Sequence, residues 1–126
     1  MGFFSRKTKL NLVTSSESIA PEFNYQIVGE SFARDGLIQL IRGHESLGEI
    51  LCEAQLVREP ENTFDPNAVM VMIDGIRVGY IPKHDSATAT RLIEDSEISE
   101  YLVPARIGWD ADNPMPLIGV TISFNL

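Results

Sequence analysis

The sequence is short of cysteine, histidine and long apolar runs, and each shortage excludes a class of protein. One cysteine, Cys52, cannot build an internal disulfide framework, and two histidines with no metal-ligand spacing give a zinc site no basis. No apolar run approaches the length of a membrane span, and the first residues lack the apolar core and cleavage site of a signal peptide. We therefore expect a cytoplasmic protein with no cofactor, no metal and no membrane partner.

Positive charge is also scarce. Ten Lys and Arg residues against 18 Asp and Glu residues give a formal net charge of −8. Proteins that coat nucleic acid present wide basic surfaces, because their affinity comes from neutralising many phosphates. The acidic balance excludes that class, and any contact with nucleic acid must be local. The first nine residues, MGFFSRKTK, are basic, but Arg6 stands where the myristoylation pattern requires Ser or Thr.

Recognisable catalytic motifs are absent as well. No Ser, Thr or Cys has a nearby base or a glycine-rich elbow, and there is no P-loop. The run Asp65-Pro66-Asn67 superficially resembles the start of a calcium loop. The sixth and twelfth positions of that loop, which must be Gly and Glu, are here Met70 and Ile76. We therefore expect a binding module and not an enzyme.

The clearest local pattern that is present is a β-hairpin around Asp74-Gly75. The residues before it, 68–73, read AVMVMI, and those after it, 76–81, read IRVGYI, and both runs have strand composition. Asp-Gly supplies the two positive-φ positions of a type I′ turn, whose twist matches that of the flanking strands. We predict a two-residue hairpin here, with Ile76 and Val78 on one face and Arg77 on the other.

Patterns elsewhere predict one domain of strands with two short helices. A chain of 126 residues with 44% hydrophobic residues suits a single domain with its own core. We expect a flexible lead over residues 1–21, with a short extended piece at 10–13, and a domain over 22–126. The expected strands are 23–32, 50–57, 101–109 and 117–124 beside the hairpin, and the expected helices are 34–42, followed by Gly43, and one from Asp85 or Ser86 to about Asp95. Such a chain is mainly β and agrees with a small, partly open β-barrel of about six strands.

The loop before the hairpin combines stiffness with an aromatic residue. Residues 59–67 read EPENTFDPN, and their prolines and asparagines cannot extend a strand but can hold a loop in one shape. Phe64 lies beside Asp65 in a segment that should face solvent. Two interpretations stay open. Either Phe64 folds back to cap the barrel while Asp65 and Asn67 bond the loop backbone, or the loop presents Phe64 to a ligand.

The run LVREPENTFDPNAVMV, followed by a hairpin and VGYIPK, resembles the signature of the HIRAN domain family. In that signature, (R/E)-(E/D)-P-x-N-x-(Y/F)-D-x-N-A-(I/V)-x-V is followed by V-G-(Y/H)-(I/L) and a basic residue. The resemblance extends from Val28 to Leu92, and it suggests a stand-alone member of prokaryotic or phage type. It implies an OB-like β-barrel with added helices, and binding of the 3′-hydroxyl end of single-stranded DNA.

The resemblance also implies which residues bind DNA. Phe64 would stack on the terminal base, Asp65 would accept a hydrogen bond from the 3′-hydroxyl, and Lys83 would bind a phosphate. In the first strand the family has an Arg-Tyr pair where this chain has Ser31-Phe32, so the ring is kept and the arginine is lost. We expect Arg34 to substitute for it. The implied set is Asn62, Phe64, Asp65, Tyr80, Lys83, Phe32 and Arg34.

The function implied by the resemblance is recruitment to single-stranded DNA ends in DNA repair or replication. A helicase or nuclease is then the candidate partner protein. An alternative from another class stays open, in which the Phe64 loop is a protein-interaction surface and its ring is the anchor. The dependence of affinity on salt separates the two, because neutralising phosphates gives a steep dependence and an aromatic anchor does not.

Overall fold

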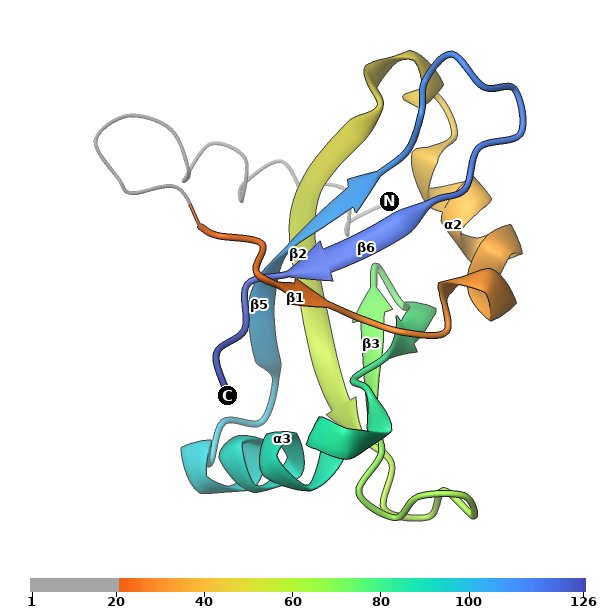
Figure 1. Cartoon of the computed structure of the whole chain (residues 1–126). Helices are drawn as coiled ribbons and strands as arrows, with labels where there is room; N and C mark the ends of the chain where they lie inside the picture. The colour runs from red at the N-terminus through yellow and green to blue at the C-terminus, as the bar shows by residue number, and fades with distance from the viewer. Residues whose placement is uncertain (1–20) are drawn as a thin grey trace.

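The computed structural model describes residues 21–126, and Figure 1 shows one antiparallel sheet that curls around a core. The six strands follow the order β1-β6-β5-β2-β3-β4. They are β1 (Tyr25–Gln26), β2 (Glu49–Arg58), β3 (Val69–Ile73), β4 (Ile76–Tyr80), β5 (Tyr101–Gly108) and β6 (Gly119–Ile122). The helices are the 3-10 turns η1 (Glu30–Ala33) and η2 (Glu45–Leu47), and the α-helices α2 (Arg34–Ile41) and α3 (Lys83–Ser96). The predicted fold class, a mainly β and OB-like architecture with two α-helices, is confirmed.

The sheet curls far enough for its two ends to meet at one point. Just after β1, the Val28 amide donates to Tyr80 O at 2.9 Å, and the Tyr80 amide donates to Val28 O at 2.8 Å. Gly79 permits this contact, because a Cβ at that position would lie 2.4 Å from Val28 O. This bridge joins the segment just after β1, the first strand of the sheet order, to the end of β4, the last, and the result is a half-barrel.

Alternation along β2 puts one face of the sheet into the core, as predicted. Cys52 and Ala54 are fully buried and Leu56 is nearly so, while the residues between them are partly exposed. Opposite them lie apolar side chains of α2 and of the other strands. Cys52 is the core filler that the alternation predicted. No helix among residues 21–126 combines the length and the apolar character needed to cross a membrane.

The predicted hairpin is present, with one addition. Asp74 and Gly75 have φ of 51° and 77°, the two left-handed positions of a type I′ turn. Met72 then pairs with Arg77 and Val71 with Gly79, so Val78 is an extra residue in β4, a β-bulge. Strict alternation would put Arg77 and Tyr80 on opposite faces. The bulge brings them together, and Arg77 Cζ lies 5.9 Å from the Tyr80 ring centroid.

Two predicted boundaries were wrong, and both errors lie next to the Phe64 loop. The strand expected over 23–32 ends after Gln26, because Gly29 takes a left-handed φ of 88° and starts η1, which carries Phe32. The second helix begins at Lys83, directly after Pro82, and not at Asp85 or Ser86. The first helix and its terminal Gly43, with φ of 87°, agree with the prediction. Apart from Pro21, the predicted N-terminal lead lies outside the described residues.

Candidate nucleic-acid interface

The Phe64 loop, residues 59–67, is stiffened by Asn62. Its Oδ1 accepts hydrogen bonds from the Phe64 amide at 2.9 Å and from the Asp65 amide at 3.0 Å. Its Nδ2 donates to Glu59 Oε1 at 3.0 Å. The base of the loop is closed by the Glu59 amide, which donates to Ala68 O at 2.9 Å. One asparagine therefore holds the two backbone amides that position the aromatic residue and the carboxylate.

Phe64 itself points into solvent. Its side chain is 88% exposed, so the interpretation in which the ring caps the barrel is wrong. The other part of that interpretation is confirmed for Asp65, whose Oδ1 accepts the Asn67 amide at 2.9 Å within the loop. The two neighbouring side chains thus behave differently: the Asp65 carboxylate is hydrogen-bonded within the loop, while the Phe64 ring projects into solvent.

Asp65 also contacts α3, and this contact favours the ionised form of its carboxyl group. Its Oδ2 accepts a hydrogen bond of 2.7 Å from Ser86 Oγ, in the first turns of the helix. The Ser86 hydroxyl, the Asn67 amide and the nearby charge of Lys83 lower the pKa of Asp65 below its usual value. The group is therefore an ionised acceptor at neutral pH, with both of its oxygens held in place.

A surface hollow of about 340 Å³ joins the loop to the sheet. It is lined by Val28, Asn62, Phe64, Asp65, Ala68, Tyr80, Ile81 and Lys83. Five of the seven residues predicted to bind DNA therefore surround one hollow, although Phe64 and Lys83 are far apart in sequence. The hairpin accounts for this, because β4 returns Tyr80 and the start of α3 to the loop that precedes β3.

A second hollow, of about 490 Å³, adjoins the same aromatic ring and is acidic. It is lined by Glu59, Pro60, Glu61, Asn62, Thr63, Phe64 and Tyr80. The Tyr80 hydroxyl donates to Glu59 Oε1 at 2.8 Å, and burial and this bond raise the pKa of Tyr80. Phe64 therefore borders a hollow that contains Lys83 and another that contains two glutamates. Of the two, only the first offers an anion a positive charge, at Lys83.

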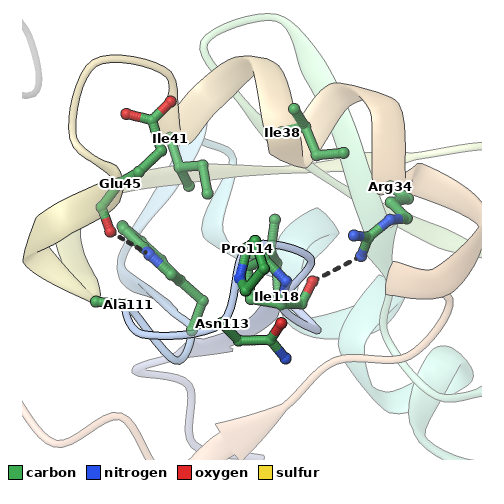
Figure 2. A pocket seen from close by; sticks show the side chains of 10 residues that line it. Arg34, Ile38, Ile41, Glu45, Ala111, Asn113, Pro114 and Ile118 are labelled. Atoms are coloured by element: carbon green, nitrogen blue, oxygen red, sulfur yellow. Dashed lines mark hydrogen bonds between the residues drawn. The ribbon is translucent and has the colours of Figure 1, made fainter.

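Phe32 and Arg34, the other two predicted residues, do not line either hollow. Phe32 is 90% exposed on η1. Arg34 donates from Nη1 to Pro116 O at 2.7 Å, as Figure 2 shows, and lines a separate hollow of about 260 Å³ with Trp109. The structure thus gives no support to Arg34 as the replacement for the missing family arginine.

Sequence reasoning missed Val28, Glu59 and Ser86. Val28 meets the hollow through the bridge to Tyr80, a contact between distant segments. The sequence marks Ser86 only as a possible start of a helix, whereas its bond to Asp65 spans 21 residues. Glu59 carried a usable signal, because a carboxylate three residues before an asparagine in a tight loop is well placed to accept from it.

These features define a class of protein: a curled β-sheet module in which a stiff loop projects an aromatic ring over a surface hollow. A family model described as the HIRAN domain matches residues 22–113, and the chain belongs to this family, which is known as a DNA-binding module. Among solved structures, the HIRAN domain of human HLTF is similar, with 16% identity, 60% of this chain and 74% of that chain covered, and a TM-score of 0.37. No curated protein sequence gives a significant match.

Proposed function

We propose that this protein binds the 3′-hydroxyl end of single-stranded DNA in the hollow of Phe64 and Lys83. It would act without catalysis, as a module that recruits a helicase or nuclease in DNA repair or replication. The observation that supports the proposal is the gathering of an exposed ring, an ionised carboxylate and a lysine around one hollow. Membership of the HIRAN domain family supports the DNA part of it.

Each of these three groups suits one part of a DNA end. An aromatic ring stacks on any base and contributes about 1–3 kcal/mol without reading the sequence. Asp65 already accepts one hydrogen bond on each oxygen, but a carboxylate has about four lone-pair sites, so it can also accept from a 3′-hydroxyl. Lys83 is the first residue of α3, where its charge and the helix N-terminus both favour a phosphate.

The charge distribution implies weak binding and a defined direction. The chain carries a formal net charge of −8, and Glu59 and Glu61 lie on the other side of the Phe64 ring. Phosphates are repelled there, so the DNA backbone should approach from the side of Lys83. Few phosphates are neutralised in this arrangement, and the affinity should depend on contacts at the end of the strand.

The test compares binding of two fluorescent oligonucleotides that differ only in a 3′-hydroxyl or a 3′-phosphate. The phosphate replaces a donor with a charged acceptor beside Asp65, which removes a charge-assisted bond of about 1.5–3 kcal/mol, so affinity should fall at least about tenfold. Asp65→Ala should reduce this discrimination. Lys83→Ala should weaken both ligands alike and lower the salt slope by about 1. Equal binding of both oligonucleotides by the wild type would contradict the proposal.

The acidic hollow favours one other function, a protein-interaction surface that uses the same ring. Glu59 and Glu61 would attract a basic segment of a partner while Phe64 fills an apolar pocket on it. If neither oligonucleotide binds at low salt, this second function becomes the better account of the exposed ring.

A further inference from the structure

Two hydroxyl side chains, Ser86 and Thr90, are the buried polar groups among residues 21–126, with exposures of 3% and 6%. They are four residues apart on α3 and so lie on one face of the helix. A hydroxyl is costly to bury unless it is hydrogen-bonded. Both residues donate to the Phe64 loop: Ser86 Oγ to Asp65 Oδ2 at 2.7 Å, and Thr90 Oγ1 to Asn67 O at 2.8 Å. The buried polar groups of the helix thus both support one loop.

Ser86 has two acceptors within reach, since its Oγ also lies 2.9 Å from Lys83 O. A hydroxyl has one hydrogen and can donate to only one of them at a time. A bond to a carboxylate is stronger than a bond to a neutral carbonyl, and the bond to Asp65 is the shorter of the two. Asp65 is therefore the main acceptor of the Ser86 hydrogen.

We propose that Ser86 is a positioning residue, which orients the Asp65 carboxylate that reads the DNA end. The inference rests on the proposed function for the DNA part. The Asn67 amide holds only one carboxylate oxygen, and the terminal torsion of an aspartate is soft. The Ser86 hydroxyl holds the second oxygen, so the plane of the carboxylate is defined before any ligand arrives. This pre-orientation lowers the cost of accepting a third hydrogen bond.

The helix also sets the distance between the two polar contacts to DNA. Lys83 and Ser86 are three residues apart in α3 and lie on neighbouring positions of its first turns. The group that binds the phosphate and the group that aims the carboxylate are thus carried by the same rigid element. Lys83 is also the charged group of α3 that acts on Asp65.

The experiment uses the full chain with Ser86→Ala, and with Thr90→Val as the matched control. Thr90→Val removes a buried hydroxyl from the same helix face, with its bond to Asn67 O, but removes no bond to the Asp65 carboxylate. In carbon-13 NMR of the free protein, the pKa of the Asp65 carboxyl should rise in Ser86→Ala and stay unchanged in Thr90→Val. The preference for a 3′-hydroxyl over a 3′-phosphate should fall by about threefold or more in Ser86→Ala only, as expected for the loss of one net hydrogen bond.

A second variant covers the case in which Ser86→Ala does not fold. Ser86→Cys keeps the side-chain volume but is a weak donor, so it should shift the Asp65 titration in the same direction. An unchanged Asp65 titration in a folded Ser86 variant overturns the inference, as does full end discrimination in Ser86→Ala. If the titration shifts while the wild type binds neither oligonucleotide, the positioning of the carboxylate is supported and only the proposed function fails.

Discussion

The Phe64 ring stays in water because its neighbours hold the loop that carries it. Asn62 accepts the amides of Phe64 and Asp65, and Asp65 accepts the amide of Asn67. These bonds restrict the backbone before any ligand is present, so little conformational entropy remains to be lost on binding. The ring contributes little to folding, because nearly all of its surface remains exposed. Its contribution to binding can therefore be measured without a change in stability.

Replacement of Phe64 by alanine should separate binding from folding. We expect the free energy of unfolding to change by less than about 0.5 kcal/mol, as for other exposed sites. Affinity for single-stranded DNA should fall by about 1–3 kcal/mol, the value of one stacked base. Leu117→Ala is the matched control, since Leu117 is also 88% exposed and lines neither hollow beside Phe64. Equal loss of affinity in both variants would show that the effect is not stacking.

The strand β4 does more than complete a hairpin. Its bulge at Val78 turns Tyr80 toward Arg77 and the loop, and Gly79 lets the chain after β1 approach closely. The Val28 bridge is made at Tyr80, the residue that also bonds Glu59. Val28 and Tyr80 therefore both close the half-barrel and line the hollow that contains Lys83.

Gly79→Ala should consequently destabilise the whole fold. The added Cβ would lie 2.4 Å from Val28 O and 2.8 Å from Ile27 Cδ1, so the backbone must move. Overpacking of this kind costs about 1–3 kcal/mol, and the bridge would weaken as well. Urea denaturation should detect the loss. Gly119→Ala, in β6, is the control, because its nearest contact would be a side-chain oxygen at 4.0 Å, and it should cost less.

The elements that the sequence predicted well are those whose causes are local. Asp74-Gly75 is enough to define the turn, and alternation is enough to define the buried face of β2. The Val28 bridge depends on how distant segments approach each other, so no short pattern predicts it. The bulge at Val78 lies within the hairpin, but the alternation of β4 does not indicate it. The same holds for the site: Phe64 and Asp65 were evident from their loop, but Ser86 acts across 21 residues.

A tyrosine side chain, Tyr25, connects β1 to α3. The Tyr25 hydroxyl donates a short hydrogen bond to Asp85 Oδ2, and its ring packs edge-on against Phe124 at 5.7 Å between centroids. Burial first, and then the Asp85 carboxylate, raise the pKa of Tyr25 well above its ordinary value. A group whose pKa is higher in the folded state stabilises the fold at low pH and loses that contribution as the pH rises.

Stability should therefore fall in alkaline solution. Above the ordinary tyrosine pKa of about 10, the unfolded chain releases the Tyr25 proton while the folded chain retains it. Tyr25→Phe should lower stability by about 1 kcal/mol at neutral pH, through the lost hydrogen bond, and flatten this alkaline decline. Denaturation of both proteins at about pH 8 and about pH 11 measures the difference. Tyr80, whose pKa is also raised, contributes equally to both. Equal losses of unfolding free energy in the two proteins between these pH values would show that Tyr25 does not cause the alkaline decline.

Trp109, the chain's single tryptophan, lies at the opposite end of the fold from the Phe64 loop, as Figure 1 shows for the ends of β2. Glu49 pairs with Gly108 beside it, whereas Arg58 leads into the loop, so a ten-residue strand of roughly 30 Å separates the two regions. Its side chain is half-buried, and its indole donates to Glu45 O at 2.9 Å. Intrinsic fluorescence should therefore report unfolding, and a DNA end that binds at the Phe64 loop as proposed should leave it unquenched. Trp109 fluorescence can thus follow stability in the presence of an oligonucleotide whose own fluorescent label tests the proposed binding.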